Sequence, residues 1–365
     1  MASTGLDFVN QFTLNNEGIT DLRKLLFLER IIGGSVTQTC DFMNGVRQGE
    51  RIGGVGELDP VGLPSNGCSP QWKNTNLVTQ EKQWDLGAYE VAEQICYDDF
   101  KDTIVRYAMN KGTDIADLTT TDYFDAILDP VMREALDKMI WRLVWFGDKD
   151  ADNVDDGGVI TDGVNPALFR INDGLFKRLY AIIAANSLQR VTIAANTATT
   201  YEDQISAIRA AGIATGIFDK ILFNAPIKLR QRADKVLLVT QSLADALTID
   251  VKRNNGSDLQ WTAVLDGLGN EVSLMTTTKY NGQTIIALPI WDEMIQSFED
   301  DGTKWNNPHR AVFASKTTLK AGTESFDMIA DLQIFFVQKD QMNHMLVKDK
   351  VGTLVWEDNL TMFAY

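Results

Sequence analysis

Apolar residues recur at helical spacing in two parts of the N-terminal half. The longer pattern covers residues 122–146 and predicts one amphipathic helix with a broad apolar stripe. Its apolar positions include 124, 127, 128, 131, 135, 139 and 143. Asp129-Pro130 is typical of a helix cap and first turn, so we expect the helix to start or bend there. A shorter pattern at 19–32 predicts a helix that follows a polar N-terminal stretch.

The segment 36–84 has a different pattern. Residues 36–42 and 71–84 are rich in Thr, Val and Trp and predict two extended strands. Between them, residues 49–70 contain six glycines and three of the eight prolines, so we expect neither a compact helix nor a regular strand there. Asn44-Gly45 also favours a tight turn, which leaves open an early fold-back of the first strand.

These features predict a long two-stranded excursion with an irregular tip. An isolated two-stranded ribbon is only marginally stable in water and needs a surface to lie on. That surface belongs either to the same chain or to another one. The length of the insertion favours another chain, since long irregular loops in compact domains are usually functional or disordered.

Helices and strands alternate between residues 167 and 300, which predicts a compact α/β subdomain. We expect helices at 172–185, 200–211, 226–234 and 241–249, and buried strands at 217–223 and 235–240. The sequence Tyr280-Asn281-Gly282-Gln283 joins two strand-like runs, 272–279 and 284–289, and predicts a tight hairpin.

The chain ends in a run of strand-like segments. They cover 311–314, 332–337, 345–347, 354–356 and 361–365. Because they follow the α/β subdomain, we expect them to return and pack with the long helix near residue 130. A strand end leading into a helix is expected at 89–104. The fold class is therefore α+β, with one layer built from both ends of the chain.

Charge and composition exclude some classes of binding partner. The chain has 34 Lys and Arg against 50 Asp and Glu, a net charge of −16, which argues against sequence-independent binding of nucleic acid. The N-terminus has no pattern of a signal peptide, and the apolar runs are too short to span a bilayer, so we expect no membrane partner. Cys40, Cys68 and Cys96 form no disulfide framework, which favours synthesis in a reducing compartment.

Catalytic chemistry finds little support. The two histidines, His309 and His344, have no ligand or catalytic partner at a recognisable spacing. No Gly-x-Ser-x-Gly motif is present, and Gly53-Gly54-Val55-Gly56 lacks the Gly-Lys-Ser/Thr ending of a phosphate-binding loop. We therefore expect no catalytic residue, no bound cofactor and no enzyme activity.

An acidic loop at 147–166 is the one candidate for ion binding. Asp148, Asp150, Asp152 and Asp155 alternate as calcium ligands do. The match to an EF-hand fails, since Asn153 stands at the usual glycine and Val159 at the usual bidentate Glu. We expect a solvated acidic loop and no metal; the alternative is a structural divalent cation without a role in chemistry.

Local stretches and the order of elements resemble one known family. The stretches are 235–255 (KVLLVTQSLADALTIDVKRNN), 278–294 (TKYNGQTIIALPIWDEM) and 307–325 (NPHRAVFASKTTLKAGTES). Together with the order of elements, they resemble the HK97-type major capsid proteins of tailed bacteriophages. The resemblance implies an N-terminal arm (1–35), an extended loop (36–88), a peripheral domain (89–166 and 306–365) with a spine helix at about 122–146, and an axial domain (167–305).

The resemblance also implies a function and partners. A protein of this family assembles with copies of itself, as hexamers and pentamers, into an icosahedral shell around the phage genome. It encloses DNA without binding it tightly, and it can meet scaffolding, portal and decoration proteins. Its location is the virion, after synthesis and assembly in the host cytoplasm. No scaffolding segment precedes the arm, so a separate scaffold is expected, and Lys73 in the extended loop identifies no crosslink.

Three other hypotheses remain open. An encapsulin-like compartment shares the fold but would need a groove for a cargo peptide, which the sequence does not reveal. Another virion part, such as a tail or baseplate protein, would be favoured by repeats or a receptor-binding tip. A cation-dependent enzyme centred on the acidic loop would need Asp150 for turnover.

Overall fold

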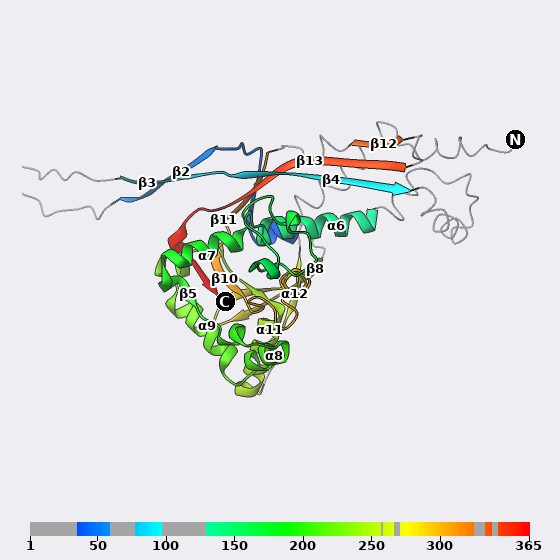
Figure 1. Cartoon of the computed structure of the whole chain (residues 1–365). Coiled ribbons are helices and arrows are strands. Elements are labelled where there is room, and N and C mark those ends of the chain that lie inside the picture. The colour runs from blue at the N-terminus through cyan, green and yellow to red at the C-terminus, as the bar shows by residue number, and fades with distance from the viewer. Residues whose placement is uncertain are drawn as a thin grey trace, which may run out of the picture.

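The computed structural model describes residues 35–58, 77–96, 129–256, 258–265, 271–324, 333–337 and 342–365. In these residues the strands form a seven-stranded sheet, a five-stranded sheet and a two-stranded ribbon. The seven-stranded sheet and its helices make up the body of the molecule, while the long strands of the other two sheets run along one side of it (Figure 1). The predicted helix at 19–32 lies outside the described residues.

The seven-stranded sheet is built from both the middle and the end of the chain. Its order is β5 (Arg190–Val191), β14 (Thr361–Ala364), β10 (Ala311–Ser315), β6 (Lys235–Thr240), β9 (Gln283–Leu288), β8 (Glu271–Tyr280) and β7 (Thr262–Leu265). Strand β6 is parallel to β9 and antiparallel to β10. Every residue of β10 and β14 is buried, as expected of central strands with both faces covered.

Helices cover the two faces of this sheet. They are α7 (Leu175–Ala185), α8 (Tyr201–Ile208), α9 (Ile213–Asn224), α10 (Ile227–Gln231), α11 (Gln241–Asn255) and α12 (Pro289–Phe298). Because side chains alternate along a strand, Leu238, Val312 and Phe363 join the apolar cluster that holds residues of α7 and α12. Their neighbours Leu237 and Phe313 join the cluster of α9 and α11 on the opposite face.

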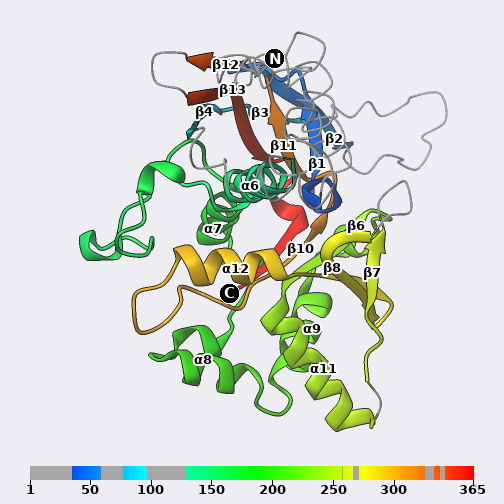
Figure 2. The same cartoon turned by 90° about the vertical axis from the view of Figure 1, so that its right-hand side faces the viewer.

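The five-stranded sheet joins segments that are distant in sequence. Its strands are β1 (Asp41–Asn44), β11 (Leu319–Thr323), β13 (Met342–Val355), β12 (Gln333–Val337) and β4 (Leu86–Cys96). Strand β4 pairs with β13 in antiparallel register from Leu86–Gly352 to Cys96–Met342. Helix α6 (Asp129–Trp141) continues into a π-helix, η5 (Arg142–Phe146), and lies between this sheet and the body (Figures 1 and 2).

Several sequence predictions are confirmed. Strand β6 has the predicted bounds, and α7 and α8 fall within the predicted helices. The hairpin of β8 and β9 turns at Asn281 and Gly282, whose φ angles are 48° and 76°, as a tight turn of this kind requires. Helix α6 is described from Asp129, beside the expected cap and first turn, whereas 122–128 lie outside the described residues.

Three predictions of local structure are wrong. Residues 217–223 belong to helix α9, because Ala214, Ile217, Phe218, Ile221 and Leu222 are buried at helical spacing. The predicted strand at 36–42 begins with a 3-10 helix, η2 (Ser35–Gln38), before β1. The glycine-rich segment does contain a regular strand, β2 (Arg51–Leu58).

The C-terminal return differs from the prediction at two strands. Strands β10 and β14 do not join the layer of the long helix but pair within the seven-stranded sheet, since their mostly apolar, fully buried sequences fit a sheet covered on both faces. Strands β11, β12 and β13 do form a layer with β4, and the segments predicted at 345–347 and 354–356 are largely parts of one strand, β13. The division of the chain into arm, loop and domains otherwise stays a prediction.

Candidate functional site

The two-stranded ribbon, formed by β2 and β3 (Leu77–Gln83), is the most prominent surface feature. The strands pair in antiparallel register from Arg51–Gln83 to Val55–Thr79, and a bulge follows before Leu58–Leu77. Within the described sheets, β2 and β3 pair only with each other, and the ribbon extends beyond the body on one side (Figure 1). The ion pair between Arg51 and Glu81 is exposed, so the body does not cover the ribbon at this point.

The base of the ribbon is fastened to the C-terminal segment. Lys82 Nζ donates to the carbonyl of Val355 at 2.7 Å and forms an ion pair with Asp358. Gly54 lies against the ring of Trp356, where a Cβ atom would come within 2.2 Å of the indole. The glycine in this strand therefore makes room for an aromatic side chain, which explains why β2 tolerates it.

A small apolar cluster lies at the same base. Trp84 is 1% exposed and packs with Val46, Leu86 and Leu354. Full burial of an indole removes a large apolar area from water, worth roughly 2–3 kcal/mol. The ribbon therefore leaves the body from a rigid root.

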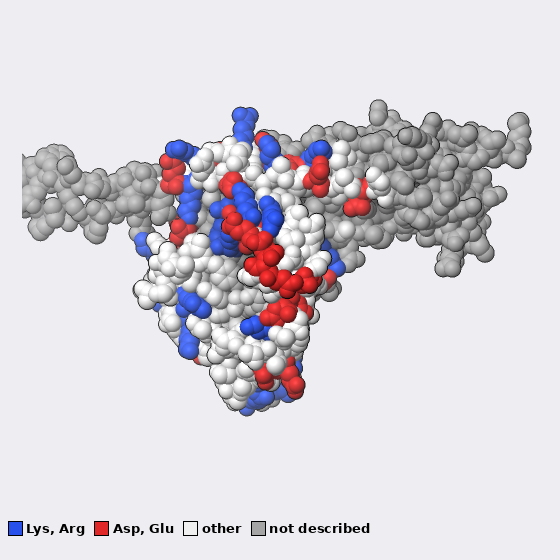
Figure 3. Space-filling view, viewed as in Figure 1, with Lys and Arg blue, Asp and Glu red and all other residues white. Residues whose placement is uncertain are grey.

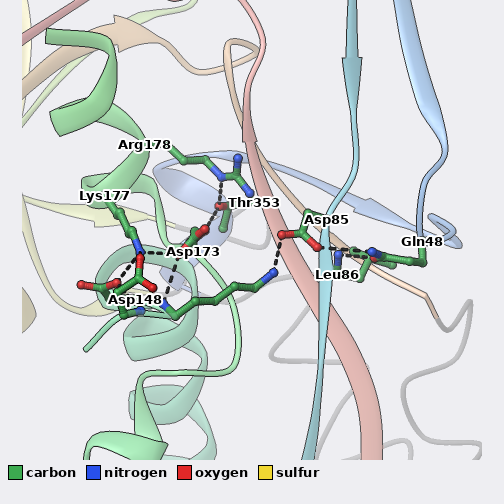
Figure 4. A network of polar contacts seen from close by, with 10 residues as sticks. Gln48, Asp85, Leu86, Asp148, Asp173, Lys177, Arg178 and Thr353 are labelled. Atoms are coloured by element: carbon green, nitrogen blue, oxygen red, sulfur yellow. Dashed lines mark hydrogen bonds and ion pairs between the residues drawn. The ribbon is translucent and has the colours of Figure 1, made fainter. Parts of the chain in front are cut away.

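A polar network extends from this root to the acidic loop (Figure 4). Gln48 accepts the backbone N–H of Leu86 at 2.5 Å and donates to Asp85 at 3.2 Å. Asp85 forms an ion pair with Lys149, whose backbone N–H donates to Asp173 at 3.1 Å. The network thus joins the chain just before β2 and just after β3 to the turn that precedes α7.

Lys177 lies at the centre of the acidic loop. Its Nζ is 2.5 Å from Asp148, 2.6 Å from Asp150 and 3.0 Å from Asp173. The ammonium group therefore supplies a positive charge among these carboxylates, and a divalent ion bound to them would have to displace it.

The other two candidate aspartates lie apart from Lys177. Asp152 pairs with Arg170, and Asp155 is exposed on the 3-10 helix η6 (Val154–Asp156). The structure thus brings Asp148 and Asp150 together but not all four residues. Among the described residues, no group of three or more His, Cys, Asp or Glu side chains has an arrangement that could hold a metal ion.

The network shifts the protonation equilibria of its members. The hydrogen bond from Lys149 lowers the pKa of Asp85. Burial opposes ionisation of Asp173, but hydrogen bonds from Lys149 and Lys177 outweigh it and lower the pKa of this carboxyl as well. Partial burial disfavours the charged form of Lys177, yet its carboxylate partners raise its pKa overall.

Arg178 extends the network to strand β13. Its Nε donates to Thr353 Oγ1 at 2.9 Å, and the Thr353 hydroxyl donates to the carbonyl of Asp173 at 2.5 Å. Strand β4 crosses the same region so closely that a Cβ atom on Gly87 would lie 1.7 Å from the carbonyl oxygen of Ile171. The ribbon root, the acidic loop and β13 therefore form one packed junction.

His309 occupies the most enzyme-like position in the described chain. It is 1% exposed, and its Nδ1 lies 2.9 Å from Ser242 Oγ. In a catalytic triad a carboxylate holds the second ring nitrogen, but here Nε2 meets the carbonyl of Gln204 at 3.2 Å. Asp292 instead accepts the backbone N–H groups of Gln241 and Ser242 at the start of α11. This arrangement gives hydrogen-bond partners to the buried His309 ring and to the backbone at the start of α11. The side chain of His344 lies outside the described part of β13.

Sequence reasoning did not identify the junction. Asp173 and Lys177 are four residues apart, a helical spacing that could have indicated their ion pair. Gln48 and Asp85 meet across 37 residues of chain, and no sequence pattern marks such a contact.

Comparisons with known proteins find a similar fold but no similar sequence. No protein-family model and no curated protein matches the sequence. A chain of a solved structure described as "Satellite phage P4 procapsid including size determination (Sid) protein" is similar over 94% of this chain and 98% of that chain, with 11% identity and a TM-score of 0.51. This chain therefore shares its mixed α+β fold with a chain of a phage procapsid.

Further solved structures are similar at lower TM-scores. A chain from Mycobacterium phage Cain is 12% identical over 96% of this chain and 97% of that chain, with a TM-score of 0.46. A chain described as "Capsid of empty GTA particle computed with C5 symmetry" is 12% identical over 90% and 88%, with a TM-score of 0.44. No helix in the described residues combines the length and apolar character needed to cross a bilayer.

Proposed function

We propose that this protein is a major capsid protein of the HK97 type, which assembles with copies of itself into an icosahedral shell around a phage genome. The observation that carries the proposal is the shared fold with a phage procapsid chain over 94% of the sequence. In a shell of this type the copies group into hexamers and pentamers.

The ribbon supports this function physically. It is held at its root, its described strands pair only with each other, and the Arg51–Glu81 pair on it is exposed. A two-stranded ribbon alone is marginally stable in water. A neighbouring subunit would cover it and remove apolar area from water, at roughly 25 cal/mol per Å² before the entropic cost of association. The ribbon thus couples the order of one subunit to the presence of the next.

The charge of the chain suits a container for DNA. A net charge of −16 disfavours tight binding to a polyanion, so the shell would enclose the genome without gripping it. Scaffolding, portal and decoration proteins are the further partners we propose, with assembly in the host cytoplasm and a final location in the virion.

The experiment is direct imaging of the purified full-length chain. Light scattering and negative-stain electron microscopy should reveal closed particles of megadalton mass, either for the protein alone or after co-expression with its scaffolding protein. Only small, stable species over a range of salt concentrations, with the scaffold present, would contradict the proposal.

A further inference from the structure

One side of the body carries an acidic face. Residues 148–162 contain six Asp and one Lys. The loop after α12 adds further carboxylates, because Asp300 N–H donates to Thr161 Oγ1 at 2.9 Å, and Tyr201 Oη donates to Asp300 at 2.5 Å and brings α8 alongside. Besides Asp150 and Asp152, which pair with Lys177 and Arg170, the exposed carboxylates of this face are Asp155, Asp156, Asp162, Glu202, Asp203 and Asp301. Red side chains accordingly gather in a band from the centre toward the lower right of Figure 3.

A second surface has the opposite character. Residues 220–233 contain four Lys or Arg and no Asp or Glu. In the same region Phe223 is 66% exposed, Ile227 is 64% exposed and Leu188 is 83% exposed. The chain elements are adjacent, since Arg232 pairs with Glu357 at 2.5 Å while Gln189 donates to the carbonyl of Asp358 at 2.6 Å. We call this surface the basic edge; it consists of Leu188, Lys220, Phe223, Ile227, Lys228 and Arg230.

The two surfaces lie on different sides of the body. In Figure 1, α9 and β5 are on the left, the side on which the ribbon leaves. The left part of the body in Figure 3 is mostly uncharged with scattered Lys and Arg, whereas the acidic band lies to its right. Figure 2 separates the acidic loop, at the far left, from α9, at the right of centre.

We propose that the basic edge of one copy docks on the acidic face of a second copy, in a head-to-tail contact that repeats around a ring. This inference rests on the proposed function, because it identifies which surfaces of the shell subunit meet. A contact between two unlike faces leaves one of each free on every dimer, so it continues until rotation closes the ring. A contact between two like faces would stop at the dimer.

Charge and hydrophobicity both favour this occupant. The chain as a whole is strongly acidic. A second copy therefore offers many carboxylates that can face the basic edge of the first. The large exposed side chains of Phe223, Ile227 and Leu188 need an apolar counterpart, and Val159 and Leu168 beside the acidic face are 41% and 37% exposed. Complementary charge at the rim also sets the orientation in which the two copies meet.

Charge reversal tests the contact. One variant carries Lys220→Glu and Arg230→Glu, a second carries Asp155→Lys and Asp156→Lys, and a third carries all four substitutions. We expect at least a tenfold loss of particles, measured by sedimentation and electron microscopy, in each double variant and recovery in the quadruple variant. The matched control, Lys220→Arg with Arg230→Lys, keeps the charge and should assemble as the wild type does.

Other outcomes overturn the inference while leaving the proposed function intact. Wild-type particles together with normal particles from both double variants would exclude these surfaces as the contact. Loss in both doubles without recovery in the quadruple variant would show that the two surfaces meet other partners. Normal shells with reduced DNA content in the Lys220→Glu/Arg230→Glu variant would assign the basic edge to nucleic acid.

A measurement on the unmodified chain avoids the question of variant folding. A zero-length carbodiimide joins amines to carboxylates that already touch. In assembled particles, mass spectrometry should find Lys220 or Lys228 linked between subunits to Asp155, Asp156 or Asp162, and these links should be missing from unassembled protein. Links from these lysines to other carboxylates only would contradict the contact.

Discussion

The Lys177 side chain shows how one residue can hold a junction together. It is 31% exposed, so water screens it only in part, and it contacts carboxylates from the acidic loop and from the start of α7. Without its charge, Asp148, Asp150 and Asp173 would repel one another. The junction would then loosen at the root of the ribbon.

Replacement of Lys177 by Met should lower the free energy of unfolding by about 1–3 kcal/mol, because charged hydrogen bonds of this kind are lost. The lowered pKa of Asp173 contributes stability above the carboxyl pKa of the unfolded chain, and this contribution disappears as pH falls through the lowered value in the folded protein. The variant should therefore lose less stability than the wild type between pH 6 and pH 3. Urea unfolding measures both effects, with Lys177→Arg as the charge-preserving control; equal stability of Lys177→Met and wild type at pH 7 would refute the role.

His309 and Asp292, both beside Ser242, should have opposite effects on how the free energy of unfolding changes with pH. Burial lowers the pKa of His309 to about 4, so the folded chain binds fewer protons there than the unfolded chain, and stability falls on acidification from about pH 6.5 to 4. Burial raises the pKa of Asp292 to about 6, so its contribution to stability rises on acidification from about pH 6 to 4.

Single variants should separate these contributions. Asp292→Asn keeps an acceptor for the N–H groups at the start of α11 and should make the acid-induced loss of stability steeper, by up to about 3 kcal/mol. His309→Gln should reverse the trend, so that stability rises between pH 6 and pH 4 relative to the wild type. Urea unfolding of the unassembled subunit at pH 6.5, 5 and 4 provides the measurement. Parallel pH profiles for the three proteins would disprove both assignments.

At the scale of elements, close approach of backbones decides where β4 can lie. Gly87 of β4 faces the carbonyl of Ile171 without space for any side chain, whereas a Cβ on Gly53 of β2 would meet nothing within 4 Å. Both glycines sit in strands, so their intrinsic strand propensities are comparable. A comparison of alanine substitutions at Gly87 and Gly53 therefore measures the cost of the close packing around Gly87.

Gly87→Ala should therefore destabilise the chain by more than about 2 kcal/mol, since backbone atoms must move. Gly53→Ala, the matched control, should stay within about 0.5 kcal/mol of the wild type. Thermal unfolding of the two variants provides the comparison. Similar melting temperatures would mean that β4 can lift from residue 171 without cost.

How far the sequence predicts these elements depends on the kind of signal. The hairpin at Asn281-Gly282 and strand β6 follow from local turn chemistry and a short apolar run, and both are confirmed. Helix α9 was mistaken for a strand because its apolar run 221–223 hides a helical spacing that extends back to Ala214. The Asp85–Lys149 contact joins residues 64 apart, and only the tertiary fold specifies it.

For the whole molecule, the decisive property is the division between a packed body and a ribbon whose described strands pair only with each other. The body holds two apolar clusters on the two faces of one sheet, and among the described side chains neither cluster contains one from β2 or β3. The stability of the isolated subunit and its capacity to assemble should therefore be separable.

Excision of the ribbon should separate them. Val55 and Thr79 are paired across the ribbon, so residues 56–78 can be replaced by an Asn-Gly turn that joins the two strands. The shortened chain should keep its circular dichroism spectrum and melt within a few degrees of the wild type, but form no closed particles. A shortened chain that still assembles normally would show that the ribbon is dispensable for the shell.

Because β14 lies between β5 and β10, the seven-stranded sheet cannot be completed until the end of the chain has been translated. Strand β5 leaves the ribosome about 170 residues before β14, a delay on the order of ten seconds or more at typical translation rates of roughly 5–20 residues per second. During that interval α7 and α9 wait beside an incomplete sheet, with apolar faces open to water. A cell that makes many copies at once would contain many incompletely translated chains with exposed apolar surface. Such chains are expected to bind chaperones.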